Sequence, residues 1–153
     1  MLTEKDYCDY DTCVALKELG YNEKSNWWFS KYLNEDSGQM ELVHICDNPA
    51  HLNYDSWGIV PKDFVIRPSH YEAQKWLREE KELFVNVELF GDYDRDADGK
   101  TLGTWVYYSY GIFNTTTAGF IREYDLCTEY QTYEEALLEG IKEAIKILKE
   151  EKE

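Results

Sequence analysis

A cluster of aspartates near the middle of the chain has the composition of a calcium-binding loop. The run Asp94-Arg95-Asp96-Ala97-Asp98-Gly99, preceded by Asp92, places carboxylates at alternate positions and a glycine at the sixth. This pattern opens the calcium loop of an EF-hand, but the twelfth position, where a bidentate glutamate is needed, is Trp105. We therefore predict an exposed, mobile hairpin loop in which Asp98-Gly99 supplies the turn. The alternative is a calcium site on Asp92, Asp94, Asp96 and Asp98.

Cysteine and histidine residues give no firm sign of zinc or of catalysis. Cys8 and Cys13, like Cys46 and His51, are separated by four residues, whereas structural zinc sites use tighter spacings. The chain contains no nucleophile elbow, phosphate-binding loop, zincin helix or glycine-rich fingerprint. We assign no catalytic residue, expect no cofactor apart from the calcium alternative, and favour a protein that is not an enzyme.

Aromatic residues are the most prominent chemical feature, with 5 Trp, 13 Tyr and 6 Phe among 153 residues. The segment 104–113 alternates like a strand, and both of its faces carry apolar or aromatic side chains. Exposed Tyr and Trp side chains anchor protein interfaces and also stack on nucleobases. We predict a binding face on the side of the sheet opposite the C-terminal helix. Its candidate residues are Tyr108 and Tyr110, with Trp27 or Trp28 from the first hairpin.

The C-terminal helix is the element around which the fold is predicted to assemble. Thr132 and Glu135 have the spacing of a capping box, so the helix should begin there and run to about Lys149. Apolar residues then repeat at the helical period and form one stripe that needs an apolar surface to cover it. The stripe consists of Leu137, Ile141, Ala144, Ile145 and Leu148.

Two further helices are expected. Ser69 and Glu72 form a second capping box at the start of a helix over 69–81, whose core side includes Tyr71, Ala73, Trp76 and Leu77. A first helix over 10–19 should be capped by Asp9 or Asp11. Gly20 should end it in the left-handed conformation, with Tyr21 folding back on its last turn.

The rest of the chain has the pattern of antiparallel strands. The expected strands are 27–33, 41–46, 83–90, 104–113 and 120–126, with a short extended piece at 64–66 and loops at 34–38 and 91–103. Short loops between successive strands indicate antiparallel pairing. We predict one α+β domain spanning residues 1–153, with a sheet of about five strands and three helices in the order α-β-β-(β)-α-β-β-β-α.

Composition and charge exclude several classes of function. A net charge of −15 cannot neutralise phosphates, so direct nucleic-acid binding is not expected. The longest uncharged run, 101–121, contains five threonines, so we expect no membrane span. The first eleven residues are acidic and polar, and four cysteines without a secretory signal indicate reduced thiols in a cytoplasm.

Two helical segments carry a resemblance to other sequences. Residues 68–80, PSHYEAQKWLREE, and residues 133–144, YEEALLEGIKEA, resemble a group of small uncharacterised proteins from phages and prophages of gut bacteria, and the exit LGYN of the first helix is similar too. These segments consist of helix caps and core faces. The resemblance therefore implies a phage-related origin and a host-cell cytoplasmic location, and it implies no functional residue.

Two classes of function remain open. In the first, the protein binds a host or viral protein, or a second copy of itself, through aromatic residues of the sheet with acidic surroundings, and inhibits a host system. A variant of this class traps a nucleotide between aromatic rings, for which the available arginines are Arg67, Arg78, Arg95 and Arg122. In the second class, the protein is a small calcium-binding protein built on the aspartate-rich loop.

Overall fold

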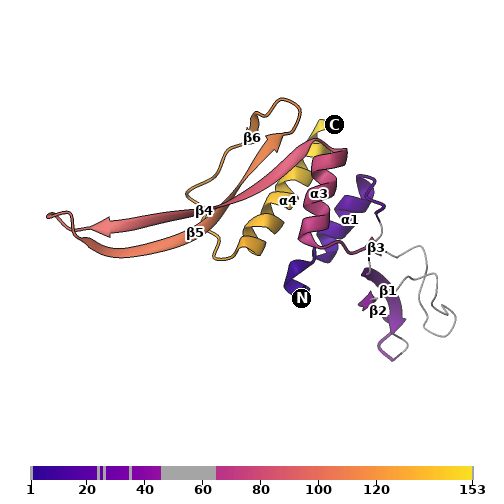
Figure 1. Ribbon diagram of the computed structural model, residues 1–153. Coiled ribbons are helices and arrows are strands. Elements are labelled where there is room, and N and C mark those ends of the chain that lie inside the picture. Colours follow the sequence, from indigo (N-terminus) through magenta and orange to yellow (C-terminus); the bar gives the residue numbers. More distant parts are fainter. Residues whose placement is uncertain (1, 24, 26, 35, 46–64, 153) are drawn as a thin grey trace. The chain divides into compact units, whose positions relative to one another are not determined.

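The structure is a computed structural model that describes residues 2–23, 25, 27–34, 36–45 and 65–152 (Figure 1). The chain divides into two compact units, Met1–Ser69 and His70–Glu153. Among the described residues, three α-helices and two three-stranded antiparallel sheets confirm the α+β class. The strands of the described segments do not join in the single sheet of about five strands that we predicted. The predicted single domain stays a prediction, and Cys46 and His51 lie outside the described residues.

The first unit begins with a short 3-10 helix η1 (Glu4–Asp6) and the helix α1 (Tyr10–Glu18). The carboxylate of Asp9 caps α1 by accepting a hydrogen bond of 2.9 Å from the Thr12 N–H. At the other end, Gly20 has a φ of +98° and the Tyr21 N–H donates to the Leu16 carbonyl at 2.9 Å. Both predicted ends of this helix are therefore confirmed.

Three strands of the first unit form a sheet in the order β2-β1-β3. The strands β1 (Trp28–Asn34) and β2 (Gln39–Ile45) form the predicted antiparallel hairpin. The short strand β3 (Val65–Ile66) pairs antiparallel with the start of β1.

Arg67 joins distant parts of the first unit. Its side chain is buried, and its Nε–H donates to the Cys8 carbonyl at 3.0 Å. The guanidinium lies 4.6 Å from the ring centre of Phe29 and 5.6 Å from that of Tyr7. Its backbone carbonyl accepts from the Ser25 hydroxyl at 3.0 Å. A buried cation is tolerable here because a carbonyl and two aromatic faces replace part of its hydration.

The second unit contains the helices α3 (His70–Glu80) and α4 (Tyr133–Glu151). The Thr132 hydroxyl accepts from the Glu135 N–H at 3.2 Å, and the Glu135 carboxylate accepts from the Gln131 N–H at 3.3 Å. The carboxylate thus reaches one residue further back than in the predicted capping box. All five residues of the apolar stripe of α4 are buried. On α3, however, Tyr71 is 65% exposed, so its assignment to the core was wrong.

The sheet of the second unit has the order β4-β5-β6, with strands β4 (Leu83–Arg95), β5 (Thr101–Asn114) and β6 (Phe120–Arg122). The predicted loop over 91–103 was too long, because the ladder of β4 and β5 continues to the pair Arg95 and Thr101. The helices α3 and α4 contact each other and pack on β4. We call the side of this sheet that faces α4 the inner face and the opposite side the outer face.

Candidate functional site

Tyr108 and Tyr110 lie on the inner face, which is the reverse of the register that we expected. A Cβ atom built on Gly140 of α4 would stand 3.0 Å from Cγ of Tyr110 and closer still to a methyl group of Val85. Tyr108 makes an edge-on contact with Tyr133, the first residue of α4, at 6.1 Å between ring centres. The two tyrosines therefore help to seat the helix, and their role as partner anchors stays a prediction.

The surroundings of Tyr110 keep its phenol protonated. Burial raises the pKa of Tyr110 to about 12, and the neighbouring Tyr130, Glu143 and Glu139 act in the same direction. Tyr130 is held beside β5 by two backbone hydrogen bonds with Tyr108, of 2.9 and 3.1 Å. A protonated, half-buried phenol is neither a general base nor a nucleophile, so this cluster is suited to packing.

The outer face carries an aromatic cluster that the chain itself covers in part. Phe113 contacts Phe120 at 4.1 Å between ring centres, and Tyr124 contacts Phe90 at 5.4 Å. Gly111 leaves room for this cover, because a Cβ there would stand 3.2–3.3 Å from the rings of Phe120 and Tyr124. The segment that follows β5 therefore folds back over the base of the hairpin.

The distal half of the hairpin, residues 88–106, extends beyond this covered base, and we call it the arm. Figure 1 shows β4 and β5 continuing as a two-stranded ribbon past the N-terminal end of α4. Every residue of the arm is exposed except Phe90 and Asp96, which are half-buried. The middle of the arm, residues 91–103, was not predicted as strand, although its signal is present in the sequence: strand-like alternation continues through Tyr93 on one side and from Leu102 on the other.

The two faces of the arm differ in chemistry. The pairing register places three large apolar side chains on the inner face, and they are 50–63% exposed. These residues are Leu89, Tyr93 and Val106. Leu102, which is 66% exposed, lies at the irregularity beside the turn and has no partner in the register. On the outer face, the carboxylates of Glu88, Asp92 and Asp94 follow one another along β4, and Trp105 of β5 lies opposite Asp92. The Trp105 indole N–H points to Glu129, with 3.4 Å between Nε1 and Oε1.

The aspartate-rich segment divides between a strand and a turn. Asp92 and Asp94 belong to β4, whereas Asp96 and Asp98 lie in the turn that joins β4 to β5. The Asp96 carboxylate accepts from the N–H groups of Asp98 and Lys100 at 3.0 and 2.8 Å, so it serves the turn itself. Gly99 has a φ of +82°, as the predicted turn requires. Within the described segments, no three acidic, histidine or cysteine side chains come together as a metal-binding group. Calcium binding stays a prediction.

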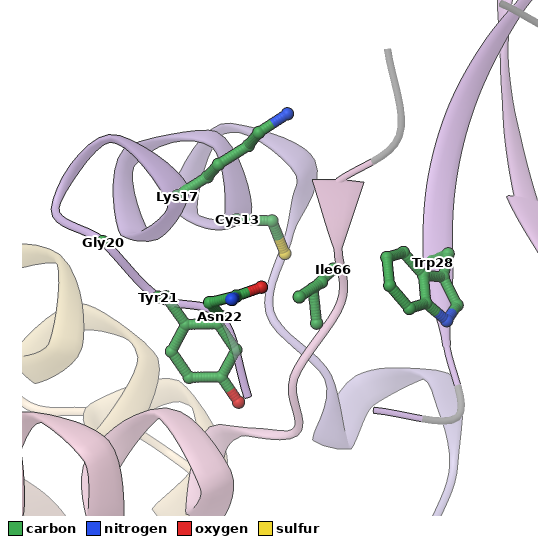
Figure 2. Close-up of a pocket in the computed structure, with 7 residues that line it drawn as sticks. All are labelled: Cys13, Lys17, Gly20, Tyr21, Asn22, Trp28 and Ile66. Atoms are coloured by element: carbon green, nitrogen blue, oxygen red, sulfur yellow. The ribbon is translucent and has the colours of Figure 1, made fainter. Parts of the chain in front are cut away.

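The remaining candidate aromatics, Trp27 and Trp28, belong to the first unit. The ring of Trp27 contacts that of Tyr7 at 5.7 Å. Trp28 lines a cavity of about 330 Å³, and Figure 2 shows it on the far side of Ile66 from Cys13. The other lining residues are Lys17, Gly20, Tyr21 and Asn22.

This cavity lacks the chemistry of an active site. Burial raises the pKa of the Cys13 thiol to about 12, so the thiolate that would act as a nucleophile is absent at neutral pH. Figure 2 shows the ammonium end of Lys17 directed away from Cys13 and Ile66. Cys13 instead donates a long hydrogen bond to the Cys8 carbonyl at 3.6 Å. We interpret these thiols as packed core groups.

Comparison with known proteins adds no relative: no family model, no curated protein and no solved structure matches this chain. Within the described part of the chain, no helix has both the length and the apolar character needed to cross a membrane. The resemblance to phage and prophage proteins accordingly remains a hypothesis.

Proposed function

We propose that this protein is a non-enzymatic binding protein that contacts another protein through its arm. The observation that carries the proposal is the exposure of large apolar side chains along a projecting ribbon. Leu89, Leu102 and Val106 are 57%, 66% and 63% exposed, although Leu89 and Val106 lie on the same face as buried residues of their strands. A ribbon of two strands is marginally stable by itself. A partner that covered the arm would stabilise it.

The exposed apolar surface is large enough to contribute measurable affinity. Full burial of a leucine or valine side chain contributes roughly 1.5–3 kcal/mol. Covering about six-tenths of each of these three side chains therefore contributes about 1–2 kcal/mol per residue. Ordering of the arm and of the partner offsets part of this gain. A polar rim normally surrounds the apolar centre of a protein interface, and the carboxylates along β4 could form such a rim beside these side chains.

The charge of the arm favours a protein partner over a nucleic acid. Between residues 88 and 100 there are five acidic side chains and two basic ones, Arg95 and Lys100. This balance repels phosphates and attracts a basic protein surface. The resemblance to phage proteins favours a host protein as the partner, with inhibition of a host system in the cytoplasm as the result.

A capture experiment with matched variants tests the proposal. Three proteins are immobilised and exposed to a lysate of a gut bacterium. They are the wild type, the arm variant Leu89→Ser with Val106→Ser, and the control Leu2→Ser with Leu126→Ser. The control removes two leucines that are 59% and 51% exposed and lie outside the arm. We expect a protein that the wild type and the control retain and that the arm variant loses.

Measured affinities then test whether the arm contacts the captured partner. With the purified partner, calorimetry should give a Kd for the arm variant at least tenfold weaker than the wild-type Kd, while the control stays within twofold. Circular dichroism should be the same for all three proteins because the changed side chains are exposed. Equal affinity of the arm variant and the control would refute the proposal. A wild-type dimer that the arm variant abolishes would identify a second copy as the partner.

A further inference from the structure

We infer that the arm binds its partner by strand addition, and that the added strand alternates basic and apolar residues along the free edge of β4. This inference rests on the proposed function and specifies the partner's chemistry. In the order β4-β5-β6, β4 is an edge strand of the sheet. In the part of the chain that the structure describes, no strand pairs with its other edge. Its outward backbone N–H and C=O groups can therefore form a further ladder, in which the Tyr93 N–H would exchange the 2.8 Å hydrogen bond that it now donates to the Asp92 carboxylate.

The opposite edge of the hairpin is a weaker site for an added strand. On the β5 side, Tyr130 already forms a two-bond bridge with Tyr108, and Glu129 contacts the Trp105 indole. The free stretch of β5 from Thr101 to Val106 also carries no charged side chain that could select a partner. Both the open ladder and the selecting charges are therefore on β4.

The side chains of β4 specify the pattern of the incoming strand. Glu88, Asp92 and Asp94 point to the outer face, whereas Leu89 and Tyr93 point to the inner face. Directly opposed side chains on neighbouring strands have Cβ atoms about 4.5–5.5 Å apart, so each side chain of the added strand meets one kind of neighbour. A basic residue suits the positions opposite Glu88, Asp92 and Asp94, and an apolar residue suits the positions opposite Leu89 and Tyr93. An alternating basic and apolar segment satisfies both rows at once.

Charge excludes a second copy of the chain as the favoured occupant of this edge. Pairing β4 with β4 of another molecule would bring the same acidic rows together, and each molecule carries a net charge of −15. Acidic residues on an edge strand thus prevent self-pairing and select a basic strand.

Synthetic peptides test the inference directly. The first probe is a nine-residue peptide of alternating Lys and Val, and the second is its isomer with all Lys residues before all Val residues. Both peptides have the same charge and apolar content, so attraction that depended only on net charge or hydrophobicity would give them equal affinity. We expect the alternating peptide to bind at least tenfold more tightly by fluorescence anisotropy. N-methylation of alternate residues along one edge should abolish binding, whereas methylation along the other edge should not.

Variants of the protein provide the matched comparison. Glu88→Gln with Asp92→Asn and Asp94→Asn should weaken binding of the alternating peptide about tenfold, since each exposed cross-strand ion pair contributes about a factor of two or three. The control, Glu123→Gln with Glu150→Gln and Glu151→Gln, removes three exposed charges elsewhere and should have less than a twofold effect. Hydrogen exchange should show protection of β4 within 88–95 on binding.

The results separate this inference from the proposed function. Equal binding of both peptides, insensitivity to N-methylation, or unprotected β4 amides would each overturn strand addition. If the Leu89→Ser and Val106→Ser variant still lost its captured partner, the arm would remain the contact surface and only its mode of binding would be wrong. If that variant kept the partner, the proposed function would fall as well.

Discussion

The replacement Gly140→Ala tests how α4 seats on the sheet. In the interior of an ordinary helix this change stabilises by about 1 kcal/mol, because alanine loses less backbone entropy than glycine. Here the new methyl group would stand 3.0–3.2 Å from the Tyr110 ring and overlap a methyl of Val85, which is fully buried. Overpacking of this kind costs about 1–3 kcal/mol. Because the β-branched Val85 side chain is fully buried, we expect the cost to lie toward the upper end of this range, with a net loss of up to about 2 kcal/mol in the free energy of unfolding.

Urea denaturation followed by circular dichroism measures this loss. The matched control is Gly103→Ala, where a Cβ meets nothing within 4 Å, and it should be neutral or slightly stabilising. Gly140→Ala should cost about 1 kcal/mol less in a Val85→Ala background than in the wild type, because the overlapping methyl group is then absent. The two changes should therefore be non-additive by that amount. If Gly140→Ala instead stabilised the protein by about 1 kcal/mol, Tyr110 and Val85 would not pack under α4. The assignment of the inner face would then be wrong.

Four further outcomes are expected. The phenol of Tyr110 should titrate late because its pKa is about 12, and Tyr110→Phe should remove one such late phase from the absorbance near 295 nm. Its unfolded pKa is near 10, so between pH 10 and 12 the folded state holds a proton that the unfolded state has lost, and stability should fall as the pH rises through that window. A thiol reagent should react quickly with the exposed Cys127 and not with Cys13, so Cys127→Ser should lower the count of fast thiols by one and Cys13→Ser should leave it unchanged. Millimolar calcium should leave the Tm unchanged; a rise that Asp96→Asn abolishes would instead establish the calcium site.

Helices were predictable from the sequence because their signals are local. The cap of α1 at Asp9, its end at Gly20 and the stripe of α4 each depend on residues within a few turns of one another. The hairpin of β1 and β2 was predictable for the same reason, since its loop is short.

The sides and lengths of the β4 and β5 strands were harder to predict. Both faces of β5 are aromatic, so alternation could not decide that Tyr110 meets α4 while Phe113 meets Phe120. Which face is inner depends on Gly140, a residue far along the chain. Residues 91–103 of the arm were assigned to a loop because the aspartates and glycines there are typical of turns. An exposed strand tolerates them, since its carboxylates remain in water.

The contacts of Arg67 have a consequence for the order in which the first unit is built. This side chain binds the carbonyl of Cys8, 59 residues earlier, and its carbonyl is held by Ser25, 42 residues earlier. Such distant closures carry a large entropy loss before any contact forms, and they slow folding. On the ribosome, α1 and the first hairpin emerge well before Arg67. The hydrogen bond between Arg67 and the Cys8 carbonyl cannot form until Arg67 has left the exit tunnel. Completion of the first unit is therefore coupled to synthesis of the second, whose first helix begins only three residues later, at His70.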